Sequence, residues 1–344
     1  MYPDSLPESA GERLNLEVDP TEDVGALVAF GGGHGLAATL SAARRVASRL
    51  TAVVTVADDG GSSGRLRREL GILPPGDLRM ALCALAGGSA GHQDLASLFQ
   101  HRYGGNGALA GHAVGNLVFA GLWEQLAEPV EALRVIEELL GTVGTVMPMS
   151  PVALDIAADV FGLEADPRLV RTIVGQVAVA STPGQVRRVR LIPSSPPATA
   201  GVTEKIAAAD MVVLGPGSWF TSVIPNVLVP EIAEALSETD ARKVLVLNLA
   251  PQPGETAGFS TERHLHVLRQ HAPNVDFDSI VLDPRTGLSD GELAQVRRTA
   301  EKLGAELVLA EVAKEAESGA IRPVHDPAAL ARALGEIGRS TPAT

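Results

Sequence analysis

The stretch VGALVAFGGGHGLAATL (residues 24–40) decides the fold. A valine-rich apolar run ends in a cluster of glycines, and apolar residues at helical spacing follow at once. This order predicts a buried strand, a tight turn and the N-terminus of a helix. Glycines let an anion approach the backbone closely, and the free N–H groups of a helix's first turn point towards it. We therefore predict a phosphate site at Gly31, Gly32, Gly33, His34 and Gly35.

Part of this turn also fits a dinucleotide fingerprint. Residues 33–38 (GHGLAA) match the form G-x-G-x-x-A. The match alone is weak in a chain with 36 glycines, where the alternative is a sharp turn without a ligand. The strand before it and the helix after it favour phosphate binding.

A second loop follows the next predicted strand, residues 51–56, which we expect to pair in parallel with the first through a right-handed βαβ unit. The strand leads into ADDGGSSGRLRR (residues 57–68). Adjacent acids beyond a strand's carboxyl end can bind ribose hydroxyls or a divalent cation. The candidates are Asp58 and Asp59, with Gly60, Gly61, Ser62 and Ser63 as donors and Arg65 as a partner for an oxyanion. The alternative is a surface turn capped by its own aspartate.

Two further motifs precede residue 120. In PPGDLR (residues 74–79) we expect Asp77 to be the N-cap of a helix that also carries Arg79. In GHAVGN (residues 111–116), His112 and Asn116 would share a helix face. Hydrogen bonding in the core and contact with a ligand both remain open for this pair.

The rest of the chain continues the alternation of strands and helices. Residues 142–197 predict a small β-rich insert, with β segments at 143–149, 152–156, 173–179 and 186–191. Strands are then expected at 209–214, 243–249, 279–282 and 306–309, and helices at 260–270, 289–303 and 327–335. The loops after the first two of these strands add the candidates Gly215, Pro216, Gly217, Ser218, Ser222, Asn226 and Asn248.

The predicted fold is a Rossmann-like, doubly wound α/β domain with a mainly parallel sheet. We expect this single domain to span residues 24–335, between a disordered leader (1–23) and a frayed tail (336–344).

Composition excludes several classes of protein. With 28 basic and 41 acidic residues and few aromatics, a nucleic-acid-binding surface is not expected. No apolar run is long enough to insert into a membrane, and the chain has neither a signal peptide nor a second cysteine beside Cys83. We expect a cytoplasmic protein with a small nucleotide-type ligand, and we leave a homo-oligomer open.

Taken together, the loops resemble those of the YvcK/CofD-like family, specifically its YvcK branch. The blocks that carry the resemblance are residues 30–36 (FGGGHGL), 54–67 (VTVADDGGSSGRLR), 74–79 (PPGDLR), 111–117 (GHAVGNL), 215–218 (GPGS) with 221–226 (TSVIPN), and 253–256 (PGET). His34, Met80 and Phe220 depart from residues usual in that branch, which are Thr, Asn and Tyr. Residues 321–326 (IRPVHD) match the branch's Arg-His-Asp only loosely, and the C-terminal tyrosine usual there is missing.

The resemblance implies UDP-N-acetylglucosamine as ligand, a role in cell shape and cell-wall control during gluconeogenic growth, and a cell-wall synthesis protein as a candidate partner. It also implies an alternative, because the sister branch contains 2-phospho-L-lactate transferases that use a divalent metal, matched here by the region of Asp58 and Asp59.

Three functions therefore compete. The first is a nucleotide-sugar-binding regulatory protein, in which no metal is required. The second is a Mg²⁺-dependent phosphoryl-type transferase, with Asp58, Asp59 and Asp77 at the metal and Arg65 or Arg79 stabilising charge. The third is an NAD-binding oxidoreductase, because Asp58 follows the fingerprint at about the distance of a ribose-binding acid.

Overall fold

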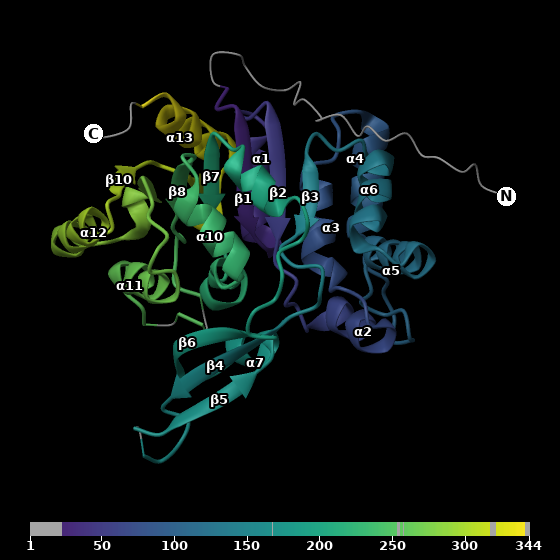
Figure 1. Ribbon diagram of the computed structural model, residues 1–344, viewed down its shortest axis with the longest axis horizontal. Coiled ribbons are helices and arrows are strands. Elements are labelled where there is room, and N and C mark those ends of the chain that lie inside the picture. The colour runs from purple at the N-terminus through teal and green to yellow at the C-terminus, as the bar shows by residue number, and fades with distance from the viewer. Residues whose placement is uncertain (1–22, 167, 253–254, 257, 317–320, 341–344) are drawn as a thin grey trace.

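A large parallel sheet dominates the computed structural model, which describes residues 23–166, 168–252, 255–256, 258–316 and 321–340. Its strands are β1 (Ala26–Gly31), β2 (Arg49–Val54), β3 (Thr145–Pro148), β7 (Met211–Leu214), β8 (Arg242–Val246), β9 (Ser279–Leu282) and β10 (Glu306–Leu309). They lie in the order β10-β9-β8-β7-β1-β2-β3, and every neighbouring pair is parallel (Figure 1). The predicted α/β fold with a mainly parallel sheet is confirmed.

Helices flank this sheet, as Figure 1 shows. They are α1 (Gly33–Ala43), α2 (Gly61–Leu70), α3 (Pro75–Ala84), α4 (Ala90–Gln100), α5 (Val114–Leu126), α6 (Pro129–Leu140), α7 (Gln176–Ala180), α8 (Val202–Ala207), α9 (Ile224–Val227), α10 (Pro230–Glu238), α11 (Thr261–His271), α12 (Asp290–Lys302) and α13 (Pro327–Arg339), with a π-helical turn η1 (Trp219–Val223) and a 3-10 turn η2 (Pro284–Thr286). Helix α1 packs against α3 and α13, and α10 packs against α8 and α9. Among the described helices, none is long and apolar enough to cross a bilayer.

The strand order places a crevice beside β1. From β1 the sheet continues through β2 and β3 on one side, and through β7, β8 and β9 on the other. The strand order thus reverses direction between β1 and β7. The connections on the two sides of this switch point leave in opposite directions, which opens a crevice at the carboxyl ends of the strands. Strand β1 is apolar along its length because a central parallel strand is covered on both faces. The glycine turn after β1 therefore opens at the natural ligand position of this fold.

The β-rich insert is smaller than the sequence indicates. Residues 145–148 pair in parallel with β2, so they belong to the main sheet. The insert proper is an antiparallel sheet of β4 (Asp155–Phe161), β5 (Val170–Val174) and β6 (Gln185–Ile192), in the order β5-β4-β6, and it protrudes from one end of the molecule (Figure 1). The strand expected at 173–179 stops at Val174, because Gly175 turns the chain at a φ of 107° and α7 follows.

The two ends of the chain also differ from expectation. Residues 1–22 of the predicted leader lie outside the described residues, as do the last four of the predicted tail. Residues 336–339 are not frayed, because α13 continues to Arg339 and buries Ile337. Gly338 lies against Val24, which ties this last turn to the entry of β1.

Candidate functional site

Three loops meet at the carboxyl edge of the sheet around a cavity of about 440 Å³, here named the cleft. His34 and Gly35 follow β1, Pro216 and Gly217 follow β7, and residues 248–252 follow β8. A Cβ atom added to Gly35 would lie 2.1 Å from the Pro216 carbonyl oxygen and 2.9 Å from the Gly217 Cα. The glycine turn after β1 (residues 31–35) and the third glycine turn, after β7 (residues 215–218), thus pack backbone against backbone.

Asn248 holds the third turn in position. Its Oδ1 accepts from the Gly217 N–H at 2.9 Å, and its Nδ2 donates to the Gly217 carbonyl at 2.8 Å. Both ends of the amide are therefore engaged by one residue of the neighbouring loop. Asn248 lines the cleft and fixes the shape of its wall.

Asp77 reaches the glycine turn from α3. The expected N-cap role is wrong, because α3 begins at Pro75 after Pro74 and places Asp77 in the first turn. Its carboxylate accepts from the Gly33 N–H, and a Cβ on Gly32 would lie 2.3 Å from its Oδ2. Burial raises the pKa of Asp77 to about 7, and the Asp58 carboxylate adds to this rise, whereas the Gly33 N–H and Arg79 oppose it. We name Asp58 and Asp77 the acid pair.

The second loop supplies Asp58 but turns Asp59 away. Asp58 accepts from the Gly60 N–H at 2.9 Å, and its Oδ2 lies 3.1 Å from a Cβ built on Gly76. Asp59 instead accepts from the Val177 N–H at 2.9 Å in the insert. The two adjacent acids therefore differ in role: one faces α3 beside Asp77, and the other fastens α7 of the insert to the loop.

Ser63 and Ser62 are both engaged inside the protein. Ser63 Oγ accepts from the Gly76 N–H at 3.0 Å, which joins the second loop to α3. Ser62 Oγ lies 2.9 Å from His112 Nδ1 and accepts from Asn116 Nδ2 at 2.9 Å. Arg79 Nε completes this buried chain by donating to Asn116 Oδ1 at 2.9 Å.

This network bears on the two alternatives for His112 and Asn116. The two side chains do not share a helix face, because α5 begins only at Val114. They meet at Ser62 instead, and both are buried. The structure thus favours hydrogen bonding in the core over contact with a ligand.

Two other candidates lie apart from the cleft. Arg65 donates to the Ala110 carbonyl at 2.6 Å and to the Ala108 carbonyl at 3.4 Å, so it braces another loop. A Cβ built on Gly61 would meet no atom within 4 Å, and this glycine has a φ of 47° at the start of α2. Its role is in the turn itself.

The polar residues after the third turn are buried beneath it. The Ser222 N–H donates to the Ser218 carbonyl at 2.7 Å, and Asn226 Nδ2 donates to the Ser222 carbonyl at 2.7 Å. The partner of this segment is Glu255, which lies in the PGET block but is not among the predicted site residues. Its carboxylate accepts from the Thr221 hydroxyl, the Phe220 N–H and the Ser218 hydroxyl. Burial raises the pKa of Glu255, and these hydrogen bonds oppose the rise.

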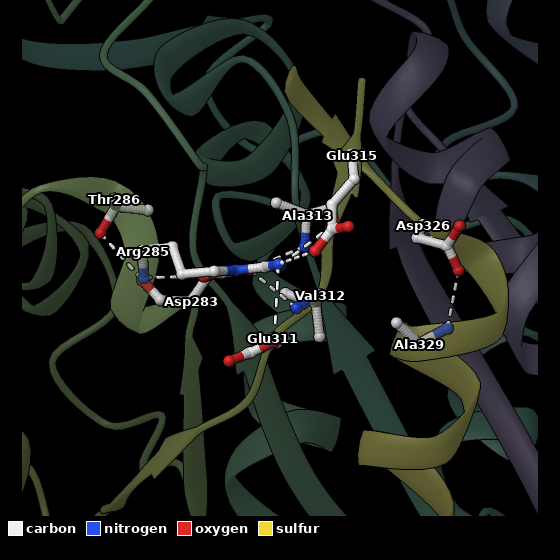
Figure 2. Close-up of polar contacts among 9 residues, drawn as sticks. All are labelled: Asp283, Arg285, Thr286, Glu311, Val312, Ala313, Glu315, Asp326 and Ala329. Carbon is white, nitrogen blue, oxygen red and sulfur yellow. Dashed lines mark hydrogen bonds and ion pairs between the residues drawn. The ribbon is translucent and has the colours of Figure 1, made fainter. Parts of the chain in front are cut away.

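The C-terminal hairpin closes the cleft, which the sequence motifs do not reveal. It consists of β11 (Ala313–Glu315) and β12 (Ile321–His325), and Pro323, Val324 and His325 line the cleft opposite His34. Asp283, at the end of β9, anchors β11 by accepting from the N–H groups of Val312 and Ala313 at 2.8 and 2.7 Å (Figure 2).

Arg285 completes this anchor. It pairs with Asp283 and reaches Glu315 at 2.7 Å, as Figure 2 shows. Burial alone would raise the pKa of Asp283, but the hydrogen bonds from Arg285 and Ala313 outweigh burial and lower it to about 2. Beside this anchor, Asp326 caps α13 through the Ala329 N–H at 2.8 Å (Figure 2).

We expect the Asp283→Asn variant to lose about 2 kcal/mol of unfolding free energy at pH 7, because an amide nitrogen would face backbone donors that now have a carboxylate. Urea unfolding measures the loss, and hydrogen exchange at the Val312 and Ala313 amides should speed up in parallel. Unchanged exchange at both amides would contradict the anchoring role.

His325 presents an unpaired acceptor beside the cleft. The imidazole bonds to the Leu247 carbonyl, while its Nε2 is buried and has no hydrogen-bond partner within the described part of the chain. Burial lowers the pKa of His325 to about 4, so the ring is neutral at pH 7. A ligand with a hydroxyl or N–H group would satisfy this nitrogen.

In the ranges that the structure describes, no group of three or more His, Cys, Asp and Glu side chains is arranged to hold a metal ion.

Comparison with known proteins identifies the family. Residues 27–323 match the family model described as "2-phospho-L-lactate transferase CofD". The chain belongs to the CofD family. Within it, the chain is 60% identical over 321 residues to a "Putative gluconeogenesis factor" of Mycobacterium tuberculosis strain H37Rv, with 92% of each chain covered. It is 39% identical over 245 residues to a "Gluconeogenesis factor" of Halalkalibacterium halodurans, covering 71% of this chain and 73% of that one.

A solved relative has the same fold. The crystal structure of a UPF0052-family protein from Bacillus halodurans superimposes with a TM-score of 0.78 at 32% identity, covering 90% of this chain and 97% of the other. These matches are compatible with a transferase of the CofD type, but they do not support the NAD-dependent oxidoreductase that the glycine fingerprint suggests. In the structure, the Asp58 carboxylate lies beside Asp77 and Gly76, at the start of α3.

Proposed function

We propose that this protein is a regulatory protein that binds a nucleotide sugar, UDP-N-acetylglucosamine or a close analogue, in the cleft. The observation that carries the proposal is the meeting of three backbone-rich loops at the switch point of the sheet, around a cavity of about 440 Å³. Small-molecule sites of this kind commonly have about 300–1,000 Å³ and a few well-placed polar groups. The volume suits a ligand with several linked parts.

Phosphate groups would bind where backbone N–H groups gather. Gly32 precedes α1 with extended backbone and no side-chain cap, so the first turn offers N–H groups of residues such as His34 and Gly35. Asp77 already occupies the Gly33 N–H. A phosphate would therefore bind on the cleft side of the turn, away from the acid pair, and the positive end of the α1 dipole would favour it.

The names of the relatives support the regulatory part of the proposal. Proteins 60% and 39% identical to this chain are named as gluconeogenesis factors. Resemblance to the YvcK branch adds control of cell shape and of the cell wall during gluconeogenic growth, with a cell-wall synthesis protein as partner. We propose that ligand occupancy of the cleft signals to this partner.

Isothermal titration calorimetry tests the ligand directly. We expect UDP-N-acetylglucosamine to bind with 1:1 stoichiometry and NAD not to bind. UDP and N-acetylglucosamine 1-phosphate serve as partial ligands, and both should bind more weakly than the complete nucleotide sugar. Absence of binding by UDP-N-acetylglucosamine, UDP and N-acetylglucosamine 1-phosphate alike would remove the proposal.

The acid pair favours a second candidate, a Mg²⁺-dependent transferase. The Asp58 carboxylate adds to the cost of ionising Asp77, a cation between the two would offset that cost, and oxygen ligands suit Mg²⁺. Asp58 and Asp77 would hold the ion, which in this second candidate would supply positive charge to a phosphoryl group bound at the acid pair instead of in the cleft. Asp59 is left out of this proposal, because its Oδ1 accepts from the Val177 N–H in the insert.

The different surroundings of Asp58 and Asp59 give a matched test of a metal at the acid pair. We expect Asp58→Asn to abolish Mn²⁺ binding, measured by electron paramagnetic resonance with Mn²⁺ in place of Mg²⁺. The Asp59→Asn variant should keep it, because that carboxylate faces the insert. Equal Mn²⁺ binding by wild type and Asp58→Asn would rule out a metal at the acid pair.

A further inference from the structure

Two histidines on α11, His264 and His271, make the same hydrogen bond through Nδ1 to a backbone carbonyl one helical turn earlier. His264 Nδ1 lies 3.0 Å from the Ser260 carbonyl oxygen, and His271 Nδ1 lies 2.7 Å from the Val267 carbonyl oxygen. A carbonyl can only accept, so Nδ1 carries the proton in both rings. Burial lowers the pKa of both imidazoles, which are therefore neutral at pH 7. In each ring, Nε2 is left as a hydrogen-bond acceptor.

The two rings differ in what meets this acceptor. The Nε2 of His271 accepts from the Val189 N–H at 3.0 Å. By contrast, the Nε2 of His264 meets no hydrogen-bond donor among the described residues. This nitrogen is buried, and only 7% of the residue is exposed. Such an orphaned acceptor is costly in the protein alone and indicates a donor that arrives from outside.

His264 lines a second cavity, of about 180 Å³, here named the side cavity. The side cavity and the cleft share residues 248–251 as a common wall, so both border the same loop after β8. The Thr286 hydroxyl donates to the Asp283 carbonyl, which leaves its oxygen as an acceptor, and Glu292 adds a carboxylate. The side cavity is thus rich in acceptors, and its volume is less than half that of the cleft.

We propose that the side cavity binds the hydroxyl- and amide-bearing sugar of the ligand whose phosphates lie in the cleft, with His264 Nε2 accepting a hydrogen bond from it. This inference rests on the proposed function. A sugar supplies donors for the His264, Thr286 and Glu292 acceptors, whereas a phosphate would bring further acceptors and be repelled by Glu292. Phe259 is an apolar residue of the same lining.

The test compares UDP with UDP-N-acetylglucosamine by calorimetry on wild type and variants. We expect His264→Phe to weaken UDP-N-acetylglucosamine binding about tenfold, because a sugar donor loses its acceptor, and to leave UDP within about twofold. His264→Gln keeps an acceptor oxygen and should restore most of the affinity. His271→Gln is the matched control on the same helix and should alter neither ligand, because His271 Nε2 is already satisfied by Val189.

A second measurement needs no substitution. The ¹⁵N resonance of His264 Nε2 should move upfield on addition of UDP-N-acetylglucosamine and stay in place with UDP. Equal weakening of both ligands by His264→Phe, or an Nε2 resonance that ignores the sugar, would overturn the inference while leaving phosphate binding in the cleft intact. If the wild type binds neither ligand, the proposed function fails and this inference fails with it.

Discussion

Replacing Gly35 with alanine is expected to destabilise the protein by about 3 kcal/mol and to weaken nucleotide-sugar binding at least about a hundredfold. The new Cβ would lie 2.1 Å from the Pro216 carbonyl oxygen and 2.7 Å from its carbon. These are backbone atoms, and Asn248 fixes the neighbouring Gly217 from the other side. The two turns must therefore separate, and separation removes the wall on which the phosphates would bind.

Gly91 provides the control for this variant. It also lies in the first turn of a helix, α4, but a Cβ there would meet no atom within 4 Å. Gly91→Ala should leave ligand affinity unchanged and keep or slightly raise stability, since alanine is the better helix former. Urea unfolding and calorimetry on both variants measure the two effects. Wild-type affinity in Gly35→Ala would show that the close approach of the two turns is irrelevant to binding.

Replacing Asp77 with asparagine is expected to stabilise the protein above neutral pH by up to roughly 4 kcal/mol. In the folded protein the pKa of Asp77 is raised to about 7 from its ordinary value of 3.8, chiefly by burial and then by Asp58. The folded state therefore holds a proton that the unfolded state releases, and the wild type loses stability as the pH rises from about 4 to about 7. Asparagine keeps an oxygen for the Gly33 N–H and removes this titration.

The pH profile distinguishes this explanation from a general gain in stability. The free energies of unfolding of wild type and Asp77→Asn should coincide near pH 4 and diverge towards pH 8. Asp283→Asn is the opposite control, because the pKa of Asp283 is lowered to about 2 and its loss destabilises the protein at neutral pH. A constant offset between wild type and Asp77→Asn from pH 4 to pH 8 would contradict a buried, shared charge at the acid pair.

Most of the main sheet and its glycine turns could be predicted from the sequence, because each depends on a local pattern. The predicted bounds of the strands at 279–282 and 306–309 are confirmed to the residue. A short apolar run between polar or glycine residues leaves little choice for where a strand begins and ends. The glycine turns were found because close backbone approach demands glycine, as Gly35 against Pro216 illustrates.

Long-range pairing could not be predicted in the same way. Residues 145–148 have the composition of the insert strands, and only their register with β2 assigns them to the main sheet. Asp77 has the sequence of a cap, yet the proline before the helix shifts it into the first turn and onto Gly33. Likewise, no motif points to His264, and IRPVHD, which contains His325, is only a loose match. Their unpaired nitrogens become visible only when α11 and the hairpin pack around the loop after β8.

A crystal structure with UDP-N-acetylglucosamine tests the central claim most directly. The account predicts density for the phosphates in the cleft, within hydrogen-bond distance of the N–H groups of the first turn of α1, between residues 34–35 and 216–217. Phosphate density away from the loops after β1, β7 and β8, with the cleft empty, would contradict it.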